Sequence, residues 1–114
     1  MSDNKQVLED LREPVKQLRS HIPEVWTSFA EMHKHSMKEG ELPVKTKELI
    51  ALAIAVVKRC DGCIASHARG AVRSKATEQE VAEALGVALM MDGATATVYG
   101  PRAFEAYLQF KENS

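Results

Sequence analysis

The 114-residue chain is poor in cysteine and in aromatic side chains, and neither sign of charge prevails. It has two cysteines, whereas a small secreted protein that depends on disulfides usually has more, spread along its length. Fifteen basic side chains oppose sixteen acidic ones, for a formal net charge of -1. This balance argues against binding to nucleic acid or to a membrane surface, because both functions need a clustered excess of positive charge. We therefore expect neither nucleic acid nor membrane among its partners.

Long apolar segments are also missing. The longest apolar run, Leu49 to Val57, has nine residues, and a membrane-spanning helix needs about 20. No apolar signal-peptide core follows the first residues, Met1 to Lys5. The length suits one domain. We expect a single cytoplasmic domain over residues 1–114, in which two nearby cysteines serve redox or metal chemistry rather than a structural disulfide.

Strand signals are absent as well. No stretch alternates apolar and polar residues, and the two Asp-Gly pairs lie between segments with helical periodicity. Apolar residues recur instead at three- and four-residue steps, as they do along one face of a helix. We predict an all-α bundle of about six helical segments. Their expected ranges are 5–19, 23 to a C-cap at Gly40, 46–58, 60–74, 77–91 and 94–111.

Several residues predict where these helices begin, bend or end. Pro14 should kink or split the first segment, since proline removes a helical hydrogen bond. Thr77 followed by Glu80 fits a capping box that opens the fifth helix. Gly100 and Pro101 predict a bend or a restart in the last one.

The segment 46–58 is apolar on every side at its centre, which predicts burial on every side. One chain of this length cannot easily cover all of it, so we predict an oligomer. A few large apolar side chains elsewhere are expected in the core or in a subunit contact. They are Trp26, Phe29, Met90 and Met91.

The most specific feature is Cys60, Cys63 and His67 at the expected start of a helix. These positions are i, i+3 and i+7, which fall within about 60° of one another on a helix that turns about 100° per residue. Cys63 and His67 are i and i+4, so a thiol–imidazole hydrogen bond is within reach. Unpaired N–H groups and the helix dipole at Cys60 favour a thiolate. A reactive thiol, a second thiol and a base are the parts of a dithiol redox centre.

Glu48 is the fourth candidate, twelve residues before Cys60. A turn over residues 59–62 would let the two helices pack so that Glu48 approaches His67 and orients its imidazole. The sequence does not decide which of the two sulfurs attacks the substrate. Helix-start electrostatics favour Cys60, and hydrogen bonding to His67 favours Cys63.

Other interpretations are compatible with the same residues. Cys60, Cys63, His67 and Glu48 could form a zinc site, or the thiols could be inert and buried in a non-redox helical oligomer. Glu48 could have no part in a relay and serve just to stabilise the start of its own helix. His21, His33 and His35 are expected in solvent, and His33 and His35 lie on different helix faces. Haem attachment is excluded because the second cysteine is not followed by histidine.

The segments Lys45 to Ala53 and Cys60 to Ile64, with His67, match a known family pattern. A glutamate is followed by eleven residues, a CxxC pair, three residues and a histidine. This pattern resembles the AhpD-like (alkylhydroperoxidase D-like) branch of the carboxymuconolactone decarboxylase superfamily, over about residues 22–110. The resemblance implies an all-helical subunit that assembles into trimers or hexamers.

The resemblance also implies a thiol-dependent hydroperoxidase or disulfide reductase with no cofactor. Glu48, Cys60, Cys63 and His67 would form its relay, and an external dithiol or thiol protein would re-reduce it. Gly62 stands where the best-known members have a second histidine, which removes one proton carrier or electrophile. The decarboxylase branch lacks the cysteine pair. The superfamily name therefore does not imply decarboxylase activity here. Lyase chemistry on a lactone acid is a further alternative, but it needs an anion-binding set of arginine and histidine, for which Arg59, Arg69 and Arg73 are poor evidence.

Overall fold

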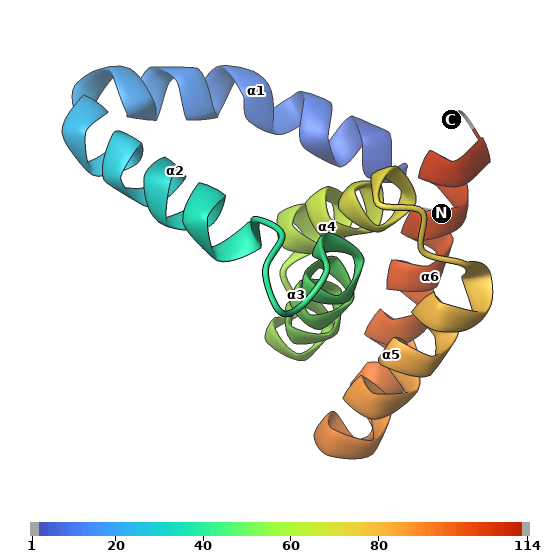
Figure 1. Cartoon of the computed structure of the whole chain (residues 1–114). Coiled ribbons are helices and arrows are strands. Elements are labelled where there is room, and N and C mark those ends of the chain that lie inside the picture. Colours follow the sequence, from blue (N-terminus) through green and yellow to red (C-terminus); the bar gives the residue numbers. More distant parts are fainter. Residues whose placement is uncertain (1–2, 113–114) are drawn as a thin grey trace.

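The computed structural model describes residues 3–112, which form six helices and no strand. The predicted all-α fold with six helical segments is confirmed. The helices are α1 (Asn4–His21), α2 (Pro23–Met37), α3 (Val44–Lys58), α4 (Asp61–Arg73), α5 (Glu78–Asp92) and α6 (Ala96–Glu112). Figure 1 shows α3 to α6 gathered into a bundle, from which α1 and α2 extend as a hairpin.

The turns between the central helices follow from local chemistry. Arg59 adopts a left-handed conformation, with φ of 54°, and its N–H closes the end of α3. Cys60 is extended and caps the start of α4. Thr77 and Glu80 form the predicted capping box, each side chain accepting a hydrogen bond from the other's backbone N–H. The end of α3 at Arg59 and the N-cap at Cys60 together place the CxxC segment at the beginning of α4.

The core lies between α3, α4, α5 and α6, and α4 packs against both α3 and α6. α4 contributes mainly small side chains, such as Ala65 and Ala68, which are fully buried and let its neighbours approach closely. The largest buried side chain is Tyr107, whose hydroxyl donates a 2.5 Å hydrogen bond to the carbonyl of Ala76. This bond ties α6 to the segment between α4 and α5.

Some predicted features of the helices differ from the structure. Pro14 and Pro101 each lie inside one continuous helix, so neither splits its segment. Pro14 is exposed, and water can satisfy the carbonyl that its missing N–H leaves free. Gly40 is not a C-cap, because α2 ends at Met37 and the extended Lys38 follows it.

The outer faces of the bundle and the hairpin expose large apolar side chains. Leu52 and Val56 of α3 are fully buried, but Ile54 is 52% exposed, so α3 is not covered on every side within one chain. Phe29, Met90 and Met91 are also exposed, so they lie outside the core of one chain, and the subunit contact expected as their other role stays a prediction. α2 has no buried residue. None of the helices in residues 3–112 is long and apolar enough to cross a membrane.

Candidate functional site

Cys60 and Cys63 are joined by a disulfide at the start of α4, and their Cα atoms are 5.2 Å apart. This separation lies in the ordinary range for disulfides. Cys60 is the N-cap, and its Sγ accepts a 3.2 Å hydrogen bond from the backbone N–H of Cys63. The sulfur of Cys60 therefore faces the positive end of the α4 dipole, where a thiolate would be stabilised in the reduced protein.

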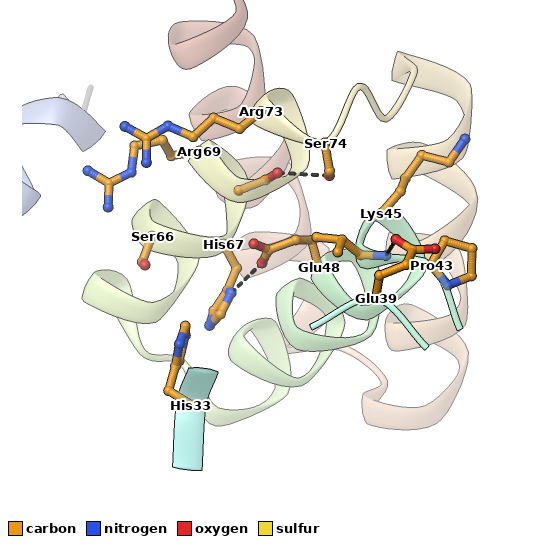
Figure 2. A pocket seen from close by; sticks show the side chains of 12 residues that line it. His33, Glu39, Pro43, Lys45, Glu48, Ser66, His67, Arg69, Arg73 and Ser74 are labelled. Carbon is orange, nitrogen blue, oxygen red and sulfur yellow. Dashed lines mark hydrogen bonds and ion pairs between the residues drawn. The ribbon is translucent and has the colours of Figure 1, made fainter. Parts of the chain in front are cut away.

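Glu48 and His67 meet as the sequence predicted. Glu48 lies in the second turn of α3 and His67 in the second turn of α4, and Glu48 Oε1 is 2.7 Å from His67 Nδ1 (Figure 2). Their side chains are only 16% and 20% exposed, so water screens this contact weakly. A carboxylate oxygen only accepts, so Nδ1 donates. In the neutral imidazole this fixes the tautomer that leaves Nε2 free to accept a proton.

His67 lies one helical turn beyond Cys63 on the same face of α4. Within the described residues its one hydrogen bond goes to Glu48, through Nδ1, and it makes none to either sulfur of the disulfide. Cys63 is exposed, whereas Cys60 is partly covered. Outside reagents therefore have the easier approach to Cys63, and the electrostatics favour Cys60.

A pocket of about 560 Å³ opens beside the Glu48–His67 pair. Figure 2 shows Glu48 and His67 turned toward each other at its centre, with His33 on one side and Lys45 on the other. The pocket extends along α4 away from the cysteines. Its walls are formed by residues of α3 and α4, the end of the loop before α3, and α2. The α4 residues are Ser66, His67, Arg69, Gly70 and Arg73, with Ser74 just beyond the helix.

His33 of α2 is a site neighbour that the sequence did not reveal. It is exposed, as expected, but its ring stacks on that of His67 with 6.2 Å between the ring centroids. The two residues are far apart in the chain, and nothing in the spacing of α2 connects them. A second imidazole thus reaches the site from another helix.

Gly62 stands where the AhpD-like pattern has a second histidine, and α1 passes close to it. A Cβ atom on Gly62 would lie 3.1 Å from Leu11 Cδ1. A histidine here would therefore press against α1 unless Leu11 moved. The hairpin both restricts position 62 and delivers His33 to the other side of the site.

Two arginines add positive charge beside the pocket. Neither Arg69 nor Arg73 forms an ion pair with a carboxylate of residues 3–112. Partial burial and the neighbouring charge of Arg73 lower the pKa of Arg69, and the charge of Glu48 opposes them. Lys45, by contrast, pairs with Glu80 at 2.8 Å.

The zinc interpretation needs a set of converging ligands. Across residues 3–112, no group of three or more His, Cys, Asp or Glu side chains is arranged to hold a metal ion. The two cysteines bond to each other, and His67 Nδ1 is held by Glu48. The arrangement instead combines a closed dithiol with a nearby imidazole–carboxylate pair.

Comparisons with known proteins agree with this fold and identify the family. The model of the carboxymuconolactone decarboxylase family matches residues 23–109. A protein of Cupriavidus necator is 37% identical over 81 residues, which are 71% of this chain and 72% of that protein. A protein of Haemophilus influenzae is 36% identical over 106 residues, 93% of this chain and 94% of that one.

Solved structures are similar over nearly the whole chain. A carboxymuconolactone decarboxylase family protein of Legionella pneumophila has a TM-score of 0.92 and 37% identity, covering 95% of this chain and 96% of its own. A family protein of Thermotoga maritima, for which a part in the antioxidative response has been suggested, has a TM-score of 0.81 and 30% identity over 92% of this chain and 90% of its own. The AhpD-like pattern of the CxxC segment is consistent with these matches, and the chain belongs to the carboxymuconolactone decarboxylase family.

Proposed function

We propose that the protein is an AhpD-like dithiol oxidoreductase that reduces a hydroperoxide or a partner's disulfide. The observation that carries this proposal is the Cys60–Cys63 disulfide at the start of α4, one turn from an imidazole held by a carboxylate. A dithiol that closes to a disulfide releases two electrons, and it takes up two electrons when it is reduced again. The proposed catalytic residues are Glu48, Cys60, Cys63 and His67, and they act within one domain.

With a hydroperoxide, one thiolate attacks the terminal peroxide oxygen. An S–O bond forms and the O–O bond breaks, so the leaving alkoxide takes a proton and departs as an alcohol. The remaining thiol then attacks the sulfenic sulfur, forms the Cys60–Cys63 disulfide and expels water. His67 accepts the thiol proton first and returns a proton to the leaving oxygen, while Glu48 keeps Nε2 available for both transfers.

With a partner disulfide, the thiolate attacks one partner sulfur and forms a mixed disulfide with it. The partner's own S–S bond breaks, and its other sulfur leaves as a thiolate that takes a proton, so the partner stays attached through the mixed disulfide. The second cysteine resolves that bond and releases the partner as a dithiol. In either reaction an external dithiol or thiol protein must supply two electrons to reopen the Cys60–Cys63 bond. Because the enzyme needs such a reductant, we further propose that it works in the cytoplasm, where thiols are kept reduced.

The test is a thiol titration of the reduced protein against pH, followed by oxidation with peroxide and mass measurement. We expect one thiol to ionise below the ordinary value of about 8.5, because the start of α4 favours its anion. Oxidation should then remove two hydrogens from the intact chain and leave no free thiol.

Two results would contradict the dithiol proposal. One is a folded, reduced protein in which neither thiol titrates while stoichiometric zinc survives dialysis, which would favour the metal interpretation. The other is oxidation that adds oxygen atoms without closing the disulfide. Residues 60 and 63 are the only cysteines of the chain, so the titration needs no correction for others.

We further propose that the chain works as a homotrimer or homohexamer. The support is the apolar outer surface of the bundle, where Ile54 is 52% and Met91 72% exposed. Large apolar side chains exposed on the surface of one chain can mark a contact between subunits.

Light scattering should therefore give a mass three or six times 12.6 kDa. Ile54→Glu should lower that mass, because a carboxylate buried between subunits would lose its hydration. The matched control is Glu112→Gln near the exposed end of α6, which should leave the assembly intact. A wild-type mass of one chain over the whole working concentration range would rule the assembly out.

A further inference from the structure

Gly70 lies within α4, in its last turn, and glycine is a poor choice inside a helix. Glycine costs a helix interior roughly 0.5–1 kcal/mol relative to alanine, because more backbone freedom is lost. Gly70 has ordinary helical geometry, since Gly93 is the one glycine of residues 3–112 with positive φ. Conformation therefore does not explain why residue 70 lacks a side chain.

The space beside Gly70 explains it. A Cβ atom built on Gly70 would lie within 2.6 Å of three atoms of Glu48, namely Cδ and both carboxylate oxygens. Such atoms need more than 3 Å between them, so the carboxylate fills the volume that a methyl group would take. The same carboxylate is the one that holds His67 Nδ1 at 2.7 Å.

We propose that Gly70 is a positioning residue, whose missing side chain seats the Glu48 carboxylate against α4 where it can orient His67. The inference rests on the proposed function only in taking Glu48 as part of the relay. A side chain at residue 70 would clash with the Glu48 carboxylate. Because that carboxylate is at the end of a flexible side chain, it would move away and the backbone of α4 would stay in place. Helix α4 itself would gain from the replacement. The fold should persist while the Glu48–His67 bond is lost.

The test is Gly70→Ala, with Gly86→Ala as the matched control. Gly86 also lies inside a helix, α5, but a Cβ atom there would have nothing within 4 Å. We expect Gly70→Ala to lower turnover on the order of 10- to 100-fold, as a small misplacement of a catalytic group does. Gly86→Ala should leave turnover within about twofold and raise Tm by a few degrees.

A spectroscopic measurement separates positioning from a general structural role. The ring ¹⁵N shifts of neutral His67 should report the Nδ1–H tautomer in the wild type. Gly70→Ala should show a substantial Nε2–H population, and Gly86→Ala should not. Adding Gly70→Ala to Glu48→Ala should lower turnover no further, because the group that it displaces is already gone.

The two proposals fail differently. If Glu48→Ala keeps full turnover, the relay is wrong, but the tautomer shift in Gly70→Ala still tests the steric inference. If Gly70→Ala keeps both the wild-type tautomer and wild-type turnover, Gly70 does not seat the carboxylate. Full additivity of the two substitutions would also overturn the inference.

Discussion

Cys60→Ser and Cys63→Ser should each abolish turnover with a hydroperoxide or a disulfide substrate, a loss of at least about 10³-fold. A serine hydroxyl is not ionised near neutral pH, and it cannot form a bond that an external dithiol reopens. Both sulfurs of the disulfide at the start of α4 are needed for a catalytic cycle, so neither variant should retain partial activity. Initial rates with a dithiol reductant measure this directly.

Single-turnover experiments on the same variants identify the attacking sulfur. The variant that keeps the attacking cysteine should consume about one equivalent of peroxide and stop as a sulfenic acid, which a dimedone-type reagent traps. The other variant should react no faster than the Cys60→Ser/Cys63→Ser double variant. The attack is on Cys60 if its capping position decides reactivity, and on Cys63 if exposure and His67 do.

Reduced wild-type protein is the right reference for folding, because every cysteine variant also lacks the disulfide. Far-UV circular dichroism of reduced wild type and variants should coincide. If either single variant turned over substrate repeatedly at the wild-type rate, the two-cysteine cycle would be wrong. That outcome would leave a one-cysteine reaction or a non-redox role.

The fold could be predicted from the sequence because its signals are local. Helical periodicity, the Thr77–Glu80 capping box and the break around Arg59 each act within one or two turns. The Glu48–His67 contact joins residues that are farther apart in the sequence. It could still be predicted, because a short turn joins α3 to α4 and leaves few ways for the two helices to pack. Local rules were less accurate where tertiary packing or solvent decides, as at the exposed Pro14.

The rest of the site depends on contacts that no spacing encodes. His33 reaches His67 because α2 runs back toward the bundle after α1 has led away from it, and α2 has no buried residue that could have indicated this path. Gly70 is one of six glycines in the sequence, and like Gly86 it lies inside a helix, so the atoms beside it, which no spacing reveals, set it apart. Exposure of Ile54 was also hidden, since an apolar helix looks the same whether its own chain or another subunit covers it.

His67→Gln should lower turnover by about 10²- to 10⁴-fold near neutral pH, the usual contribution of general acid–base catalysis. Glu48→Gln should cause a smaller loss, because the imidazole remains but its orientation and tautomer are no longer fixed by a carboxylate 2.7 Å away. The double variant should be no slower than His67→Gln alone, since Glu48 acts through His67.

The pH dependence of the loss distinguishes a base from a structural histidine. If His67 removes the thiol proton, its absence matters less as pH rises, because the thiol ionises unaided above a pH of about 8.5. The deficit of His67→Gln should therefore shrink between pH 7 and 9 when rates are compared with wild type. A histidine that only supports the fold would leave a deficit that does not change with pH.

The chain offers a matched control for this relay. His35 and Glu31 also form a His–Glu pair, 3.4 Å apart, but on the exposed surface of α2, where their side chains are 65% and 57% exposed. Water screens such a pair, so His35→Gln and Glu31→Gln should each leave turnover within about twofold. Equal losses from the His35 and His67 substitutions would show that the partly buried pair has no special role, and the relay would have to be abandoned.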